Sequence, residues 1–355
     1  MCTSLIVAAA LLGGCGDADQ AASPSTSTTA GESRPSNAKE ARPAFAGEPS
    51  PSFPRQLYVS LDGPLNPANV AIAVAQDKGF FTDAGLSVQA STGVPVLPRR
   101  PVRYVAAYTD DFALTQQPQV AMAKAKGAPI VAVGTLVPHP TAAMIWLKRS
   151  GIRGIADLEN KTIAVPGIPY QEGMLESILE RAGVDPADVE VKRVDYRSVP
   201  VLLAGKADAI FGGSWNIEGV ALRERGVKPV IKRVQQLGVP AYDELVVITR
   251  ADWAAREPGV VRRFMTALKR GVVALGRNPE IALASIEGGG SHYRGISTRQ
   301  TNAQLRATLP LLASTGRFDP DRAGRLLAWM HDEGMIARKP PISGVFTNQY
   351  LSGEG

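Results

Sequence analysis

Short apolar runs alternate with amphipathic stretches from Gln56 onward, at the spacings typical of strands and helices. The first cycle predicts a strand at 56–62, a helix at 67–85 and a second strand from Leu86. Further strands are predicted at 110–115, 128–137, 142–149, 162–167, 189–196, 207–211, 228–234 and 243–250. Helices are predicted at 117–127, 154–161, 171–183, 198–206, 257–276, 299–313 and 319–335. This alternation predicts an α/β protein with mainly parallel sheets.

Two such cycles, joined by strands that leave one sheet and later return, predict two α/β lobes with a cleft between them. We expect lobe 1 to comprise 55–141 plus 243–355 and lobe 2 to comprise 142–242. The two connections are expected to act as hinges, near 138–146 and 240–246, when the lobes close on a solute.

The N-terminus differs in composition from the rest. An apolar run ends in small residues and Cys15, which resembles a secretory signal with a lipoprotein cleavage site. The run is shorter than the ~20 apolar residues that span a bilayer. The next forty or so residues have almost no large aliphatic side chain, and such a stretch cannot offset its ordering entropy. We therefore predict a signal peptide at 1–14, lipidation of Cys15, a disordered tether at 15–54, and an extracytoplasmic body anchored to the bacterial cell membrane.

Charge and cysteine content exclude several classes. The net charge is +6, but Lys and Arg are scattered, and their densest group, at 260–270, has the spacing of a solvated helix face. No nucleic-acid partner is predicted. The two cysteines are Cys2 and Cys15, so the body has no thiol for a disulfide, a metal or a nucleophile. The histidines lie far apart in sequence, and no P-loop or GxSxG motif occurs; we predict no metal and no cofactor.

Unusual polar and aromatic residues follow the predicted strands, where ligands of α/β sheets gather. They are amides, carboxylates and aromatics, with no Arg or Lys among them. The candidate ligand-binding residues are Asp62, Asn66, Asn69, Gln116, Gln117, Tyr170, Gln171, Glu172, Trp215, Asn216, Glu218, Tyr242 and Glu244.

Trp215 is the most specific of these candidates. It follows an apolar strand and two glycines, which allow a bound molecule to approach the backbone closely. We expect it to stack on a flat ligand, with Asn216 and Glu218 supplying polar contacts. Structural alternatives remain open: Trp215 as lobe core, Glu218 as a helix cap, Asp62 bonded to its own loop, and Tyr242 as a packing residue of the hinge.

Several motifs, in order, resemble the SsuA/THI5-like family. They are "LDGPLNPANVAIAVAQDKGFFTDAGLSV", "TQQPQVAMAKAKGAPIVAVGTLVPHP", "GGSWNIE", "VPAYDELVVI" and "FTNQYL", which extend from about 57 to 351. Within the family they most resemble pyrimidine-binding proteins of thiamine-precursor importers. The resemblance implies a type II periplasmic-binding-protein fold. It also implies a monomeric receptor that delivers a small solute to the permease and ATPase subunits of an ABC importer.

The family also contains enzymes that make the thiamine pyrimidine, using a first-loop histidine and a cysteine-rich iron-binding motif. Asn69 occupies that histidine position here and the body has no cysteine, so the resemblance does not imply an enzyme. The carboxylates and aromatics favour a heterocycle with an amine, and a pyrimidine thiamine precursor fits best. The alternatives are a receptor of the same fold for riboflavin or for an alkanesulfonate- or nitrate-type solute, and a pyrimidine synthase-like enzyme. The family's first-loop tryptophan is Gly63 here, so one wall of the usual pocket is absent.

Overall fold

The computed structural model describes residues 54–91, 101–194, 197–288 and 297–351, all within one unit, Glu48–Gly355. The predicted signal peptide, Cys15 and the tether up to residue 53 lie outside the described residues. In the described ranges no helix has the length and apolar character needed to cross a membrane.

The first sheet, which we call sheet A, has the strand order β2-β1-β3-β10-β4. Its strands are β1 (Arg55–Ser60), β2 (Leu86–Ser91), β3 (Phe112–Thr115), β4 (Ile130–Val137) and β10 (Leu245–Arg250). β1 runs parallel to β2 and β3, and β10 runs antiparallel to β3 and β4. Every residue of the inner strand β3 and of the edge strand β4 is buried, which indicates that both strands are covered on both faces.

The second sheet, sheet B, has the order β7-β6-β8-β5-β9. Its strands are β5 (Ala142–Leu147), β6 (Thr162–Val165), β7 (Glu190–Arg193), β8 (Ala209–Ser214) and β9 (Pro229–Arg233). β6 is parallel to β7 and β8, and β5 is antiparallel to β8 and β9. In each sheet the antiparallel strand is the one that follows a change of sheet. The first crossing is residues 138–141, between β4 and β5, and the second is 238–244, before β10.

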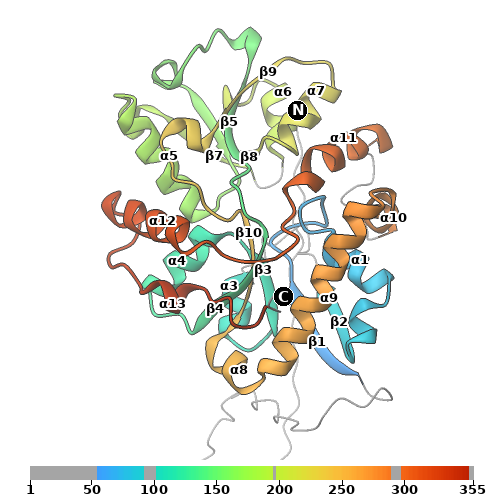
Figure 1. The fold of residues 1–355 in the computed structure, drawn as a ribbon. Helices are drawn as coiled ribbons and strands as arrows, with labels where there is room; N and C mark the ends of the chain where they lie inside the picture. The colour runs from blue at the N-terminus through green and yellow to red at the C-terminus, as the bar shows by residue number, and fades with distance from the viewer. Residues whose placement is uncertain (1–53, 92–100, 195–196, 289–296, 352–355) are drawn as a thin grey trace, which may run out of the picture. The chain divides into compact units, whose positions relative to one another are not determined.

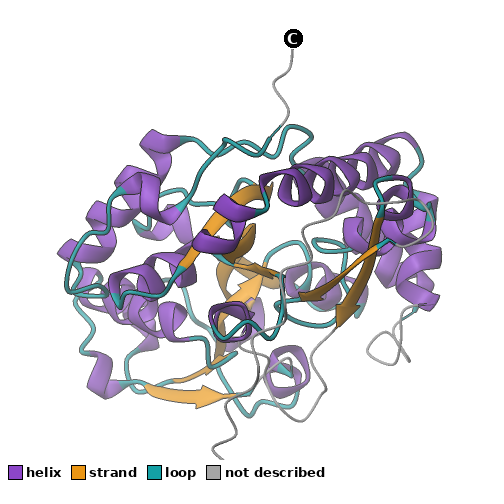
Figure 2. Cartoon of the chain, turned by 90° about the horizontal axis from the view of Figure 1, so that it is seen from below, coloured by secondary structure: helices purple, strands orange, loops and turns teal. Residues whose placement is uncertain are grey.

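Helices lie around both sheets (Figures 1 and 2). They are α1 (Ala71–Asp77), α2 (Phe80–Asp83), α3 (Pro101–Ala106), α4 (Gln117–Ala125), α5 (Pro169–Arg181), α6 (Ser198–Leu203), α7 (Glu218–Glu224), α8 (Ala251–Arg256), α9 (Pro258–Arg277), α10 (Glu280–Gly288), α11 (Thr298–Thr308), α12 (Pro320–Asp332) and α13 (Ile342–Val345).

Alternate residues of strands such as β3 and β10 enter different cores, as the two-residue period of a strand requires. On one face of sheet A, Leu57 and Val247 pack under α1, α9 and α10. On the other face, Ala113 and Ile248 pack with α4 and α12 in a core that continues through Met144 into sheet B and reaches α5. A third, smaller core lies between sheet B and the helices α6 and α7. The apolar packing is therefore continuous from one sheet to the other past the crossings.

Three predicted helices differ from the structure. The helix expected at 67–85 is split into α1 and α2, because Gly79 between them has a left-handed backbone with φ of 70°. The segment 154–161 contains only a 3₁₀ turn, Ile155–Leu158. The helix expected at 299–313 ends at Thr308 and is followed by a 3₁₀ turn, Leu309–Leu311, with Pro310 in its middle position. Helix α3 is not predicted by the sequence pattern, and α7 is indicated only by the alternative of Glu218 as a helix cap.

Candidate functional site

The predicted site residues lie on loops at the carboxyl ends of parallel strands and on the second crossing. Asp62 follows β1 and Gln116 follows β3, whereas Tyr170 is the second residue of α5, after β6, and Trp215 follows β8. Tyr242 and Glu244 belong to the second crossing. In open α/β sheets this edge is where ligands bind, because the loops there lead into helix N-termini.

Five of these residues form what we call the central cluster: Asp62, Gln116, Tyr170, Tyr242 and Glu244. Gln116 Nε2 donates to Asp62 Oδ2 at 2.8 Å. The rings of Tyr170 and Tyr242 lie 6.5 Å apart at 79°, an edge-to-face contact. The charges of Glu244 and Asp62 both act on Tyr170. The cluster thus joins loops of sheet A, loops of sheet B and the crossing between them.

The electrostatics of the central cluster are dominated by burial. Burial raises the pKa of Asp62 to about 6, although hydrogen bonds from Asn69 and Gln116 act in the opposite direction. Burial also raises the pKa of Glu244, and the charge of Asp62 adds to that effect. For both tyrosines burial raises the pKa well above the usual value, so the phenols remain protonated donors. A group that donates a proton or a hydrogen bond to the carboxyls therefore suits this cluster better than an anion does.

Glu244 also joins the two crossings. Its Oε2 accepts from the backbone amides of Thr141 at 2.6 Å and Ala142 at 3.3 Å. Its own amide donates to the carbonyl of Val137 at 2.8 Å. Within the described ranges no Arg or Lys lies within ion-pair distance of this carboxylate. The buried hydroxyl of Tyr242 interacts with Tyr170 and Glu244, although neither contact has the geometry of a full hydrogen bond. Tyr242 and Glu244 thus interact with each other and retain capacity for a further contact.

Asn66 and Asn69 hold the loop that carries Asp62. Asn66 Oδ1 accepts from the amide of Ala68 at 2.8 Å, and Asn69 Oδ1 accepts from the amide of Asn66 at 2.7 Å. Asn69 Nδ2 donates to the carbonyl of Pro64 at 3.1 Å, and the residue is fully buried. The structure therefore gives both asparagines a role in shaping this loop.

Gln117 and Gln171 tie helices to neighbouring backbone. Gln117 Oε1 accepts from the amide of Asp243 at 2.9 Å, which fastens the start of α4 to the second crossing. Gln171 Nε2 donates to Tyr170 Oη and to the carbonyl of Gly212, both at 3.2 Å. Gly212 has φ of 79°, and a Cβ there would lie 2.4 Å from Gln171 Oε1. A side chain at position 212 would therefore displace the amide of Gln171.

Glu172 is outside the central cluster. Its carboxylate forms a two-point ion pair with the exposed guanidinium of Arg193, with Nε at 2.7 Å. Asn216 is buried and donates from Nδ2 to Thr308 Oγ1 on α11 at 2.7 Å. Glu218 Oε2 accepts from the amide of Ser214 at 2.6 Å, which closes the loop before α7, and burial raises its pKa. These three side chains have partners within the protein.

Trp215 is half-buried and packs against the core under α6 and α7. The guanidinium carbon of Arg233 lies 4.0 Å from the centroid of its ring, a cation–π contact. No carboxylate of the described residues lies within ion-pair distance of Arg233. Arg233 and Arg193 end the two edge strands of sheet B, each in a Lys-Arg-Val sequence. This repeated ending is the sequence signal for a basic residue beside Trp215, and the pattern of polar residues after strands does not include it.

Two further features of the structure bear on other ligands. In the described ranges no group of three or more His, Asp or Glu side chains could hold a metal ion. A surface groove of about 660 Å³ lies beside α9, lined by Lys78, Phe80 and Ile281 among others, and contains none of the predicted site residues.

Two mixed sheets joined by two crossings form the fold of periplasmic binding proteins, as the comparison with solved structures shows. The alkanesulfonate-binding protein SsuA from Xanthomonas axonopodis pv. citri matches with a TM-score of 0.64 at 16% identity, over 83% of this chain and 98% of that chain. The aliphatic sulphonate binding protein SsuA from Escherichia coli matches with 0.65 at 15% identity, over 84% and 99%. Identities this low establish the fold alone.

The chain belongs to the NMT1/THI5-like family, whose profile matches residues 66–282. A Haemophilus influenzae protein named for thiamine biosynthesis is 31% identical over 286 residues, 80% of this chain and 88% of that protein. The formylaminopyrimidine-binding protein of Halalkalibacterium halodurans is 31% identical over 225 residues, 63% of this chain and 68% of that protein. The family and the fold class predicted from the sequence are therefore confirmed.

The relatives also include enzymes. A 4-amino-5-hydroxymethyl-2-methylpyrimidine phosphate synthase of Legionella pneumophila is 26% identical over 297 residues, 81% of this chain and 89% of that protein. Membership of the family therefore leaves two functional classes, a binding protein and a synthase, and the residues of this chain have to separate them.

Proposed function

We propose that this chain is the solute receptor of an ABC importer and that its solute is an aminopyrimidine related to the pyrimidine of thiamine. The central cluster carries the proposal, because two carboxyls of raised pKa and two neutral phenols meet there from both sheets. A 4-aminopyrimidine offers an amine donor, a basic ring nitrogen and a flat face, which are the complements of those groups.

In this proposal the two sheets and their helices form two lobes that move apart to admit the solute. Gln116, Tyr170 and Tyr242 are buried and Asp62 and Glu244 are half-buried, so a solute contacts all five side chains only when the loops of sheet A and sheet B separate. Glu244 and Asp62 accept hydrogen bonds from the amine or ring nitrogen, and Tyr170 and Tyr242 enclose the ring. Closure is favoured by the solute only through contacts that the open state lacks, and a cluster built from both lobes provides them.

Trp215 forms the outer wall of the site in this proposal, with its ring parallel to the solute. Arg233 covers the ring now and moves aside or contacts a substituent of the solute when binding occurs. A guanidinium held by a cation–π contact alone is released at low cost, about 0.5–1 kcal/mol at an exposed site.

Receptor function is favoured over synthesis by two features of the chain. Asn69, at the position of the family's first-loop histidine, is fully buried and bonded within its own loop. The folded body contains no cysteine, since the two in the chain are Cys2 and Cys15. We propose no chemical step. Incubation with pyridoxal phosphate, iron and oxygen should yield no pyrimidine, and turnover that depends on a histidine would overturn the receptor assignment.

We also propose that Cys15 carries a lipid that anchors the receptor outside the cytoplasm, beside its permease. The support is the apolar run before Cys15 and the polar stretch after it. Intact-mass spectrometry of protein from a bacterial membrane fraction should show a diacylglyceryl cysteine as the N-terminus. Replacement of Cys15 by Ser should release the protein from that fraction.

The ligand is tested by titration calorimetry with formylaminopyrimidine, 4-amino-5-hydroxymethyl-2-methylpyrimidine, riboflavin and an alkanesulfonate. We expect saturable binding of a pyrimidine and its loss in Glu244→Gln. Glu176→Gln is the matched control, because Glu176 is an exposed carboxylate on α5. Tight binding of the sulfonate with no response to either pyrimidine would reject the proposed solute, although the protein would still be a solute receptor.

A further inference from the structure

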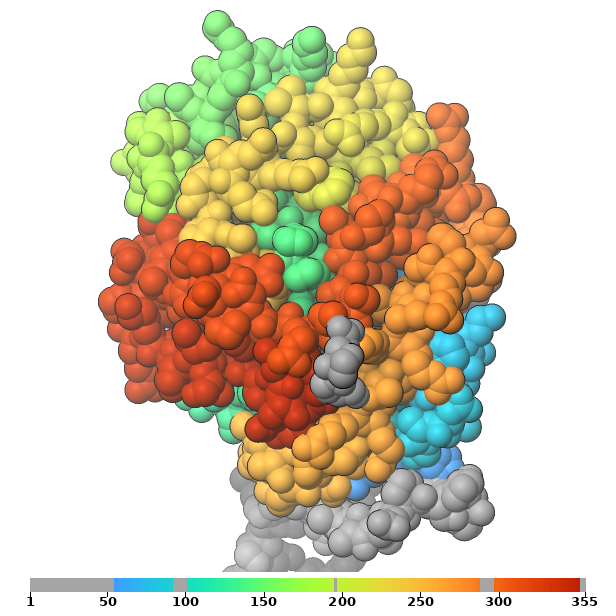
Figure 3. All heavy atoms as spheres, viewed as in Figure 1, coloured from blue at the N-terminus to red at the C-terminus, as the bar shows by residue number. Residues whose placement is uncertain are grey.

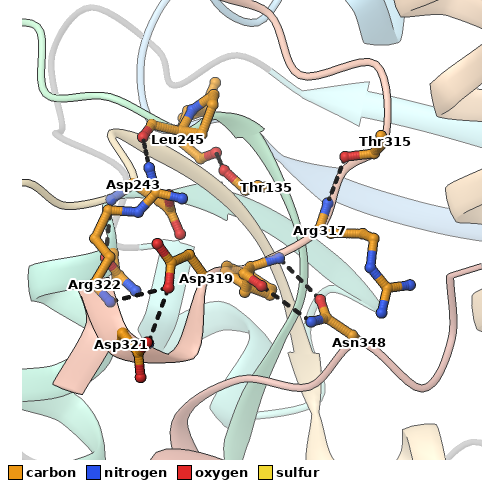
Figure 4. A network of polar contacts seen from close by, with 12 residues as sticks. Thr135, Asp243, Leu245, Thr315, Arg317, Asp319, Asp321, Arg322 and Asn348 are labelled. Carbon is orange, nitrogen blue, oxygen red and sulfur yellow. Dashed lines mark hydrogen bonds and ion pairs between the residues drawn. The ribbon is translucent and has the colours of Figure 1, made fainter.

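A second polar network lies on the side of the second crossing that faces α12 (Figure 4). Asp243 is fully buried and its Oδ1 lies 3.4 Å from Arg322 Nη2. Arg322 Nη1 donates to the carbonyl of Pro138 in the first crossing. One guanidinium therefore contacts both segments that connect sheet A to sheet B.

Arg322 is held on a fixed support. It is the third residue of α12, whose N-cap Asp319 accepts from the amides of Asp321 at 2.9 Å and Arg322 at 3.2 Å. Phe318, just before the cap, donates to Asn348 Oδ1 at 2.9 Å and accepts from Asn348 Nδ2 at 3.1 Å.

The segment that contains Asn348 is joined in turn to sheet A. Phe346 forms a parallel bridge with Ala132, and the amide of Thr347 donates to the carbonyl of Ala132 at 2.9 Å. In Figure 3 the orange and red atoms of the C-terminal segments lie on both sides of a narrow strip of green atoms. The start of α12 is thus attached to sheet A, and the side chain of Arg322 reaches from there to the two crossings.

The opposite end of α12 contacts the layer of sheet B. Glu333 pairs with Arg181 at the end of α5, and a Cβ on Gly173 would lie 3.2 Å from the methyl group of Met335. A change in the angle between the sheets must therefore alter contacts at both ends of this helix.

Asp243 stands between two residues of the central cluster in the chain. Tyr242 and Glu244 interact with Tyr170 and Asp62, whereas Asp243 is directed toward Arg322. The backbone of Asp243 is also held, because it exchanges two hydrogen bonds with Gln117, at 2.9 and 3.2 Å. Three successive residues are thus fixed on opposite sides of one segment.

We propose that Arg322 is a positioning residue for the solute site. It joins the first crossing to Asp243 and thereby sets the spacing of the two crossings. This spacing determines where Tyr242 and Glu244 stand relative to a solute. The inference deepens the proposed function, since the site it positions is the proposed solute site.

The geometry requires an arginine. A guanidinium has a planar fork of donors that reaches a carbonyl and a carboxylate at once, whereas an ammonium is a single point charge. Arg322→Lys is therefore expected to keep only part of the effect.

The first readout uses the unliganded protein and does not depend on the identity of the solute. The amides of Thr141, Asp243 and Glu244 are each hydrogen-bonded across or beside the crossings. In Arg322→Met their hydrogen exchange should accelerate about tenfold or more, as for a local opening made easier by 1.4 kcal/mol. Exchange in α7 should be unchanged. Arg325→Met is the matched control, because Arg325 is exposed on the same helix.

The second readout is the affinity for 4-amino-5-hydroxymethyl-2-methylpyrimidine, measured with the melting temperature. Arg322→Met and Asp243→Asn should each weaken binding by about tenfold, and the double variant should bind no worse than Arg322→Met, because the two residues act through each other. A purely structural role would lower the melting temperature in proportion to the loss of affinity.

The outcomes separate the two proposals. If the wild type binds no pyrimidine but exchange at the crossings responds to Arg322→Met, the proposed solute is wrong and the positioning role stands. If exchange at the three amides is unchanged, or if the two substitutions weaken binding independently, the positioning role of Arg322 is wrong.

Discussion

Replacement of Asp243 by Asn should make the protein more stable at neutral pH, although it removes a partner of Arg322. Asp243 is fully buried, and burial raises its pKa to about 6, while Arg322 lowers the pKa and Asp319 raises it. The free-energy cost of burying the carboxylate is therefore larger than the free energy gained from its attraction to Arg322. An amide of the same shape removes that cost.

The magnitude follows from the linkage between protonation and folding. The folded state has a pKa of about 6 where an ordinary aspartic acid has 3.8. The difference of about 2 pKa units corresponds to about 3 kcal/mol, at about 1.4 kcal/mol for each unit. Because the folded pKa is raised, this stabilisation is complete below pH about 4 and is lost as the pH rises through about 6. Wild type should lose this stabilisation between pH about 4 and pH above 6, whereas Asp243→Asn, which has no carboxyl at this position, should not.

Chemical denaturation at several pH values between 4 and 8 measures the difference. The variant should gain up to about 3 kcal/mol on wild type between pH 4 and pH 7.5. Other titrating groups remain in both proteins, including His139, whose pKa is lowered by burial and by the charge of Arg322. Asp321→Asn is the control, because Asp321 is an exposed carboxyl next to Arg322 on α12. A difference that is constant with pH, or that favours wild type at pH 7.5, would refute the reasoning.

Three further substitutions test other parts of the site. Trp215→Ala should weaken pyrimidine binding about tenfold or more with a nearly unchanged melting temperature. If Trp215 is a core residue, the substitution should instead lower stability by ~3–5 kcal/mol, and calorimetry with a thermal melt distinguishes the two roles. Glu244→Gln should reduce affinity without lowering stability at pH 7.5, because burial raises the pKa of Glu244 and disfavours its charge; the same two assays would contradict this if stability fell and affinity did not. Gly212→Ala should lower the free energy of unfolding by more than Gly226→Ala, because both glycines have positive φ but only a Cβ at Gly212 meets another residue, Gln171 at 2.4 Å; equal losses in denaturation would show that backbone strain alone matters.

The strands and helices and their order along the chain could be predicted from the sequence because buried strands consist mainly of apolar residues. The runs "FALT" and "IVAVGTLV" are entirely apolar or small apart from their threonines, and both are fully buried strands. The split between α1 and α2 could not be predicted from apolar spacing, since the spacing continues across Gly79 while the backbone does not. Only the left-handed conformation of that glycine separates the two helices.

The site is harder to predict from the sequence than the fold, because it is formed by contacts between residues that are far apart in the chain. Strand endings placed Asp62, Tyr170 and Glu244 near one edge, and the structure brings them together. The same rule also selected Glu172, which pairs instead with Arg193, a residue on a neighbouring strand. The contact of Arg322 with Asp243 spans 79 positions of chain and has no local pattern to indicate it.

The most direct test of the proposed function is the identity of the molecule that the protein binds. Native mass spectrometry of the wild-type body, purified without added ligand and then titrated with 4-amino-5-hydroxymethyl-2-methylpyrimidine, formylaminopyrimidine, riboflavin and an alkanesulfonate, reports every complex by its mass. We expect a single pyrimidine per chain, with the complex lost in Glu244→Gln and retained in Glu176→Gln. A complex with riboflavin or the sulfonate alone, or pyrimidine binding that survives Glu244→Gln unchanged, would contradict the assignment of the central cluster as an aminopyrimidine site.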